Sequence, residues 1–271
     1  MHLDFLHFLI PLLITGIFSG LLAGLLGVGG GIIIVPVVFY LLKQYGYSTD
    51  IIMHVSIASS LGVILLTSMS SIYTHLKLDN VEIKVLKKWV IGVVLGSIVG
   101  AIFASSISGD ILIIIFVILA SVVAINMLLD KNIFFSRELP KNTLLNNTIS
   151  FFIGCLSAII GIGGGSFSVP ILSAFGKNMH KAVGTSASIG FFIALPGLIT
   201  YIISGMQINN LPPYSLGYIN LQIIITISIT SVLIAPLGAK ISKKLNRKTL
   251  KKIFALFLLM TCVSLIVNQY S

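Results

Sequence analysis

The sequence predicts an all-α polytopic membrane protein built from two inverted repeats, each a re-entrant or broken helix hairpin followed by three transmembrane helices. Three observations lead to this prediction. The composition is strongly apolar, the apolar stretches recur at lengths that suit a bilayer, and one glycine-rich motif occurs twice.

Composition sets the broad class. Of the 271 residues, 56% are hydrophobic and only 9% are charged, and the mean hydropathy is +1.10. A soluble domain with a single buried core does not have this balance. Runs of about 20 apolar residues cross the hydrocarbon as helices, because helices satisfy their own backbone hydrogen bonds there. We therefore expect a multi-pass protein of the cell membrane (inner or plasma membrane), surrounded by the lipid bilayer.

The apolar segments form two sets of five. We expect a first membrane repeat over residues 1–130, a cytoplasmic linker over 131–146 and a second membrane repeat over 147–271, together one integral membrane domain. The second segment of each set is short, since helices over residues 32–42 and 166–175 would rise only about 16 and 15 Å. That is roughly half of the hydrocarbon thickness. The expected segments are 8–26, 32–42, 50–75, 84–106, 109–130, 147–162, 166–175, 181–204, 216–238 and 250–268.

The repeated motif marks an internal duplication. Gly-Val-Gly-Gly-Gly begins at residue 27 and Gly-Ile-Gly-Gly-Gly at residue 161, and each is followed by Val-Pro at the same spacing. Between residues 20–36 and 154–170, eight of seventeen aligned positions are identical. Repetition at this level predicts two structurally related halves.

Charge chooses between two topologies. If each glycine block only kinks one continuous helix, each half has four crossings and the basic stretches are divided between the two faces. If each short segment turns back as a re-entrant arm, the halves are inverted and only Lys43 falls on the opposite face. The positive-inside bias then makes the basic face cytoplasmic and predicts that both termini are extracytoplasmic. The first apolar segment lacks basic residues before it and a clear cleavage site, so we expect it to be retained. The basic stretches on the common face are residues 77–88, 131–141, 177–181 and 240–252.

The glycine blocks are candidate anion sites. Consecutive glycines allow backbone N–H groups to converge, and a helix that begins just after them directs the positive end of its dipole to the same place. A phosphate loop for nucleotides is excluded, because no strand-helix context surrounds either block and neither is followed by Lys-Ser or Lys-Thr. Close helix packing and a tight turn remain the alternative role. The candidate substrate-binding glycines are Gly29, Gly30, Gly31, Gly163, Gly164 and Gly165.

Hydroxyl side chains stand near both glycine blocks. Hydroxyls donate hydrogen bonds to oxyanions, but in buried helices they also bond to their own backbone or to a neighbouring helix. Both roles stay open from the sequence. The first block is followed by Ile32 and Ile34 where the second has serines, so the two halves cannot bind an anion identically. The candidate hydroxyl ligands are Ser59, Ser60, Ser166, Ser168, Thr185 and Ser186.

Other chemistry is not expected. Cys155 and Cys262 lie in apolar segments without metal-ligand spacing, so we expect packing roles and neither a metal nor a cofactor. No His, Asp or Glu lies deep enough to activate a serine, so we expect no enzyme. Nor does any Asp, Glu, Lys or Arg lie well inside a predicted crossing, which leaves ion coupling unexplained. His54, His75 and His180 lie toward helix ends. Glycines at every fourth residue are expected to pack helices, namely Gly16, Gly20, Gly24, Gly92, Gly96 and Gly100.

The duplicated Gly-x-Gly-Gly-Gly with Val-Pro, the Gly184-Thr185-Ser186 motif and the two-half layout resemble the TauE/SafE family of sulfite and organosulfonate exporters. The resemblance covers essentially the whole chain. It implies export of a small sulfur oxyanion, such as sulfite, sulfoacetate or a related sulfonate, by alternating access. By motif it implies substrate contact at both glycine blocks and at Thr185 and Ser186, whereas the first half reads Ala58-Ser59-Ser60. An anion channel is the nearer alternative and an intramembrane enzyme the remoter one. Besides the small anionic substrate we expect no nucleic acid partner, and a homo-oligomer is left open.

Overall fold

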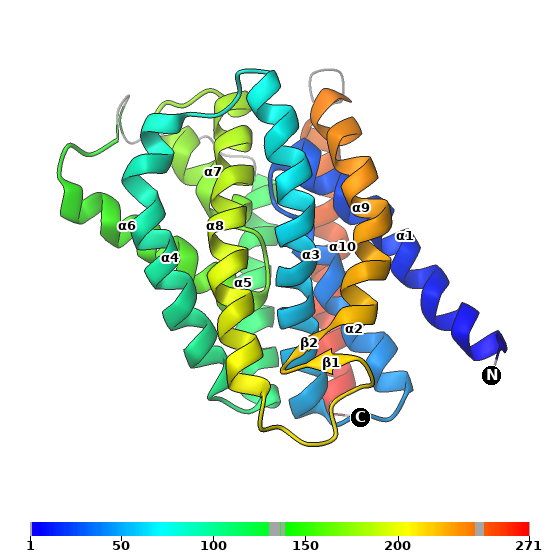
Figure 1. Ribbon diagram of the computed structural model, residues 1–271. Coiled ribbons are helices and arrows are strands. Elements are labelled where there is room, and N and C mark those ends of the chain that lie inside the picture. Colours follow the sequence, from blue (N-terminus) through cyan, green and yellow to red (C-terminus); the bar gives the residue numbers. More distant parts are fainter. Residues whose placement is uncertain (1, 130–135, 137–138, 242–246, 271) are drawn as a thin grey trace.

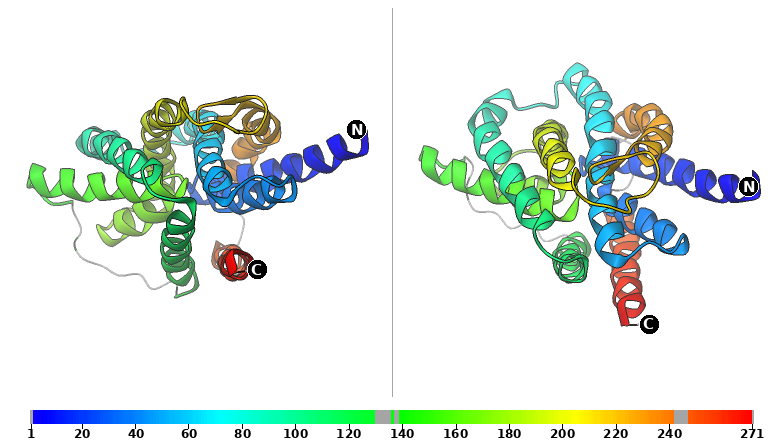
Figure 2. Two further views of the ribbon diagram at one scale, coloured as in Figure 1. Left: turned by 90° about the horizontal axis from the view of Figure 1, so that it is seen from below. Right: turned by 60° about the horizontal axis from the view of Figure 1, so that its bottom comes forward.

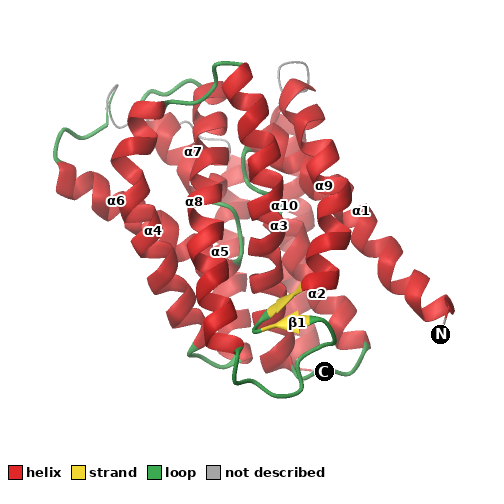
Figure 3. Cartoon of the chain, viewed as in Figure 1, coloured by secondary structure: helices red, strands yellow, loops and turns green. Residues whose placement is uncertain are grey.

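Ten helices and one short pair of strands make up the part of the chain that the computed structural model describes, residues 2–129, 136, 139–241 and 247–270 (Figure 3). The helices of the first half are α1 (His2–Leu26), α2 (Gly31–Gln44), α3 (Thr49–Lys77), α4 (Ile83–Ser105) and α5 (Gly109–Leu129). Those of the second half are α6 (Thr143–Ile160), α7 (Gly165–Ala174), α8 (Met179–Gly205), α9 (Leu221–Ile241) and α10 (Arg247–Tyr270). The protein is therefore an all-α polytopic membrane protein, as predicted.

Seven of the helices in the described residues are long and apolar enough to cross a membrane, namely α1, α3, α4, α5, α6, α8 and α9. The two helices that follow the glycine blocks are short, with 14 residues in α2 and 10 in α7. At about 1.5 Å per residue, α7 extends only about 15 Å. The last helix, α10, packs along α5 within the bundle.

The chain forms two inverted units, each of which begins with a helical hairpin and continues with further helices (Figure 1). In this view α1 rises from the lower end of the bundle and α2 returns to that end. In the second half α6 descends from the upper end and α7 returns upward. Both chain termini lie toward the lower end. Each short helix is thus the returning arm of a hairpin, and the alternative of one continuous kinked helix is not what the chain forms.

The halves are interleaved. The hairpin helix α1 packs mainly on α9 of the second half, and α6 packs mainly on α4 of the first half. Seen from below, the outer ends of α1 and α6 project from opposite sides (Figure 2). The glycine faces predicted from the sequence form these contacts: a β-carbon on Gly20 would lie 2.5 Å from the carbonyl oxygen of Ser231, and one on Gly96 would lie 2.0 Å from that of Phe151. Their packing role is confirmed.

Basic residues collect at one end of the bundle. In Figure 1 the upper end holds the ends of α3, α7 and α9 and the starts of α4, α8 and α10, which carry the basic side chains. Lys43, near the end of α2, lies at the lower end. Lys131 and Arg137 lie outside the described residues. The described basic residues at the upper end include Lys77, Lys84, Lys87, Lys88, Lys177, Lys181, Lys240, Lys251 and Lys252.

One prediction from the sequence was wrong in detail. The apolar segment expected from residue 216 begins instead as a two-residue antiparallel pair, β1 (Ser215–Leu216) with β2 (Ile219–Asn220), and helix α9 starts only at Leu221. Gly217, at φ +56°, turns the chain between the strands. The Asn220 carboxamide oxygen then accepts the amide proton of Ile223 at 3.0 Å, which caps the helix.

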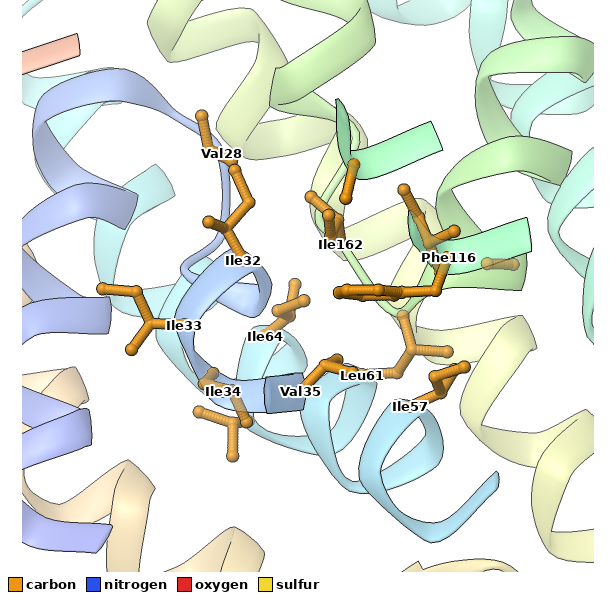
Figure 4. Close-up of a cluster of buried hydrophobic side chains, with 14 of the residues drawn as sticks. Val28, Ile32, Ile33, Ile34, Val35, Ile57, Leu61, Ile64, Phe116 and Ile162 are labelled. Carbon is orange, nitrogen blue, oxygen red and sulfur yellow. The ribbon is translucent and has the colours of Figure 1, made fainter. Parts of the chain in front are cut away.

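The apolar core surrounds the glycine loops. Figure 4 shows side chains of α2 and α3 and the side chains of Phe116 and Ile162 packed together, with no polar atom in the cluster. Ile57, Leu61 and Phe116 are each fully buried. Much of the surroundings of the loops is therefore apolar, and an unpaired polar group is costly there.

Candidate functional site

The two glycine loops meet in the middle of the molecule. We call residues 27–31 the first glycine loop and residues 161–165 the second. A β-carbon built on Gly31 would lie 2.2 Å from the carbonyl oxygen of Gly161, and one on Gly165 would lie 1.9 Å from that of Gly27. Both distances are shorter than any real contact, so only glycine fits at these positions. The sequence thus permits the two helix N-termini, α2 and α7, to approach backbone to backbone.

The loops differ in conformation although their sequences match. Gly30, which precedes α2, has φ +79°, a left-handed value that disfavours any residue with a β-carbon. Its counterpart Gly164, which precedes α7, has φ −49°, a value open to all residues. The duplication therefore produced two loops of unlike geometry, and only the first depends on left-handed glycines just before its helix.

The amides of the loops are unpaired. In the described part of the chain, the backbone N–H groups of the six candidate glycines have no hydrogen-bond acceptor in the protein. All six residues are buried. The first amides of any helix lack a partner within the helix. Here the glycine loops that precede α2 and α7 add further unpaired amides. A buried unpaired N–H costs about 1–3 kcal/mol, so this concentration of donors favours an anionic ligand. The six glycines are Gly29, Gly30, Gly31, Gly163, Gly164 and Gly165.

Three of the candidate hydroxyls hold the second glycine loop in place. The Ser60 hydroxyl donates to the carbonyl oxygen of Gly161 at 2.7 Å, across the interface of the halves. The Ser168 hydroxyl donates to the carbonyl oxygen of Gly164 at 2.6 Å, and its oxygen lies 2.7 Å from the hydroxyl oxygen of Ser186. These contacts use carbonyl oxygens of the loop and leave its amides uncommitted.

Two further hydroxyls bind the ends of other helices. Ser59 of α3 accepts the amide proton of Asn220, just before α9, at 3.0 Å. Thr185 of α8 accepts the amide proton of Glu82, just before α4, at 2.9 Å. Each long central helix thus caps a helix of the other half. Of the two roles left open by the sequence, bonding within the protein is the one these side chains have in the structure.

Ser166 is the exception among the candidate hydroxyls. It is the second residue of α7, and its buried hydroxyl oxygen has no hydrogen-bond partner. Its position in the first turn places it beside the unpaired amides of the second glycine loop.

A cavity that was not predicted from the sequence lies next to the first glycine loop. Its lining is formed by Ala23, Gly27, Gly29, Ile64, Ser68, Ser71, Ala187 and Gly190. The signal in the sequence was the run of hydroxyls from Thr67 to Thr74, in which members three or four residues apart share one helix face. That face is buried at Thr67, Ser71 and Thr74.

No ionised side chain compensates the charge of an anion at the loops. In the described ranges no Asp, Glu, Lys or Arg is buried, and no three potential metal ligands lie together. His54 is buried at the lower end, where Nε2 lies 3.0 Å from the carbonyl oxygen of Ala104 and the ring stacks on Tyr218. It therefore takes part in the packing of that end. The donors available at the loops are amides and hydroxyls.

Known proteins resemble this chain along its length. The model of the family described as sulfite exporter TauE/SafE matches residues 12–265. A "probable membrane transporter protein" of Haemophilus influenzae is 34% identical over 261 residues, which cover 95% of this chain and 98% of that protein. Another of the same description, from Methanocaldococcus jannaschii, is 27% identical over 93% of this chain and 92% of its own length. A third, YunE of Bacillus subtilis, is 26% identical over 94% and 96%. No solved structure matches the chain significantly.

Proposed function

Since this chain belongs to the sulfite exporter TauE/SafE family, and is therefore a membrane transporter, we propose that it exports a small sulfur oxyanion, such as sulfite or a small sulfonate, by alternating access. The anion is bound where the two glycine loops meet. Inverted repeats with broken helices allow one central site to be exposed to each side in turn.

The observation that carries this proposal is the set of unpaired buried amides on the two loops. An oxyanion accepts several hydrogen bonds at once, and charge-assisted bonds are about twice as strong as neutral ones. The N-terminal ends of α2 and α7 add favourable dipole charge. Because no Lys or Arg among the described residues is buried to supply a full positive charge, the site suits an anion that must also be released.

The roles of the hydroxyls divide by their contacts. Ser166 donates to the anion, because its hydroxyl has no other partner. Ser60, Ser168 and Ser186 fix the second loop around it. Ser59 and Thr185 do not contact the anion; they fix the helix ends that pack over the site.

The direction of transport is taken from the family's description as exporters, and the charge distribution and the membrane potential support it. With the basic end of the bundle cytoplasmic, both termini are outside and the lysines attract anions to the inner entrance. An interior-negative potential drives each negative charge outward with about 2.3 kcal/mol per 100 mV. A coupling ion is therefore not required for export.

The proposal is tested by counterflow in liposomes that contain the purified protein. We expect unlabelled sulfite or a sulfonate on one side to drive uptake of labelled sulfite from the other, with saturation. Ser166→Ala is expected to raise the half-saturating concentration about tenfold, the loss of one hydrogen bond to a charged group. Absence of exchange for every sulfur oxyanion offered, by protein that remains folded, would contradict the proposal. Conductance without exchange would indicate a channel instead.

A further inference from the structure

The cavity beside the first glycine loop lies on one side of the site. It is bounded by Gly27 and Gly29 of the loop, by Ser68 and Ser71 of α3, and by Gly190 of α8. Ser68 and Ser71 belong to the second half of α3, which leads to Lys77 at the basic end. The cavity therefore lies between the glycine loops and the basic end of the bundle.

The opposite side is packed. Matching Ser59-Ser60 with Thr185-Ser186 places Gly197 at the position in α8 that Ser71 has in α3. A β-carbon on Gly197 would lie 3.1 Å from a methyl carbon of Leu61 and 2.9 Å from the hydroxyl oxygen of Ser97. Leu61 also belongs to the buried apolar cluster, where it lies near Ile57 and Phe116 (Figure 4). The position of Ser71 thus borders a cavity, whereas the corresponding position in α8 is closely packed.

Ser71 differs from its neighbours in the same run. The hydroxyls of Thr67, Ser68, Ser70 and Thr74 all have hydrogen-bond partners within the protein. Ser71 is 1% exposed, lines the cavity, and its hydroxyl oxygen has no partner. A buried hydroxyl normally bonds to the carbonyl four residues earlier or to a neighbouring helix. An unpaired one in a cavity is a donor that is available for a ligand.

Gly190 keeps the cavity open. A β-carbon added to most of the helix glycines would collide with backbone, but one added to Gly190 would meet no atom within 4 Å. Helix packing therefore does not require glycine there. In the interior of α8 a glycine lowers the stability of the helix by about 1 kcal/mol relative to alanine. The absence of a side chain at this position therefore leaves room in the cavity at the expense of stability.

From these observations we propose that Ser71 is a substrate-binding residue on the basic side of the site, donating its hydroxyl proton to one oxygen of the transported oxyanion. This inference rests on the proposed function. The cavity has room for a group of about the size of one water molecule, which matches a single oxygen of a sulfite or sulfonate. The remaining oxygens then face the glycine loops, where the amide of Gly29 has no acceptor in the protein.

Two variants test the inference, and neither is expected to destabilise the protein. Ser71→Ala removes an unpaired hydroxyl, and Gly190→Ala places a methyl group in open space within a helix. Neither change is expected to lower the melting temperature, and Gly190→Ala is expected to raise it. Both are expected to raise the half-saturating sulfite concentration in counterflow, by about tenfold for Ser71→Ala.

Ser70→Ala is the matched control. Ser70 lies on the same helix one residue away, and its hydroxyl donates to the carbonyl oxygen of Val232 at 2.9 Å. We expect the half-saturating concentration of this variant to stay within about twofold of the wild type, because its partner is α9 and not the cavity.

The outcomes separate the two proposals. If the wild type exchanges sulfite and Ser71→Ala and Gly190→Ala keep its half-saturating concentration, the assignment of Ser71 is wrong and the transport function stands. If the wild type exchanges no sulfur oxyanion, both are overturned. A melting temperature lowered in Ser71→Ala would show that its hydroxyl serves the fold, and would also overturn the assignment.

Discussion

The hydroxyl oxygen of Ser59 accepts a hydrogen bond from the backbone amide of Asn220 at 3.0 Å, and so joins α3 of the first half to the start of α9 in the second. Thr185 makes the reciprocal contact with Glu82 at the start of α4. Both bonds join the two halves, and they lie toward opposite ends of the bundle. Together they stabilise the interface between the halves at both ends.

We expect Ser59→Ala and Thr185→Val each to lower the free energy of unfolding by about 1 kcal/mol, the usual value of a helix-capping hydroxyl. Half-saturating sulfite concentrations should change by less than about twofold. Thermal unfolding in detergent and counterflow in liposomes measure the two quantities. A large loss of affinity with unchanged stability would instead make these hydroxyls direct ligands.

The two glycine loops should respond differently to the same substitution. Gly30→Ala places a β-carbon at φ +79° and 2.6 Å from the carbonyl oxygen of Ser19, so we expect a loss of at least about 1–2 kcal/mol of stability. Gly164→Ala has an ordinary backbone angle. Its β-carbon would lie 2.5 Å from the terminal methyl carbon of Ile193 and 2.9 Å from a methyl carbon of Ile189, so it would displace side chains and not backbone.

We therefore expect Gly164→Ala to lose less stability than Gly30→Ala and to show its effect mainly in transport. Melting temperatures of both variants, measured beside counterflow rates, separate the two cases. Equal destabilisation by the two substitutions would contradict the difference in loop geometry.

The glycine face of α4 should be intolerant of any side chain. A β-carbon on Gly96 would lie 2.0 Å from the carbonyl oxygen of Phe151 in α6, a contact that only separation of the helices relieves. We expect Gly96→Ala to cost about 1–3 kcal/mol, as overpacking does. The measurement is the melting temperature, with Gly190→Ala as control because it makes the same exchange in a helix that has space for it. A Gly96 variant as stable as that control would contradict the packing described.

Single cysteines should report the orientation of the basic end. In a background without Cys155 and Cys262, we expect cysteines at positions 84 and 252 to be labelled from the cytoplasmic side and one at position 43 from the outside. All three side chains are exposed and lie near helix ends. A membrane-impermeant maleimide applied to intact cells, and then to opened ones, makes the distinction. Opposite sides for positions 84 and 252 would contradict the inverted arrangement.

Much of the fold could be predicted because its signals are local. Apolar length predicted the helices, and the glycine blocks predicted the breaks after Leu26 and Ile160 to within two residues. The strand pair at residues 215–220 was missed because two residues per strand leave no periodic pattern. Its formation depends on the turn at Gly217 and on contacts such as the one with Ser59.

The site was predicted less completely, since the partner of a hydroxyl depends on contacts distant in sequence. Nothing local to Ser60 shows that it bonds Gly161, or that Ser166 stays unpaired while Ser168 does not. The matching glycine motifs also gave no sign that Gly30 and Gly164 differ in backbone angle. Ser71 belongs to a run of hydroxyl residues that is visible in the sequence. Only the structure shows that its hydroxyl is the one in that run without a hydrogen-bond partner.

The packing of α1 on α9 also bears on how the protein is made. The glycine-lined surface of α1 is synthesised well before α9, the helix that covers it. Until then Gly16, Gly20 and Gly24 border on lipid or on a helper protein of the insertion machinery. A nascent chain stopped before α9 would therefore remain an open intermediate, which quality-control proteases should remove faster than the finished transporter.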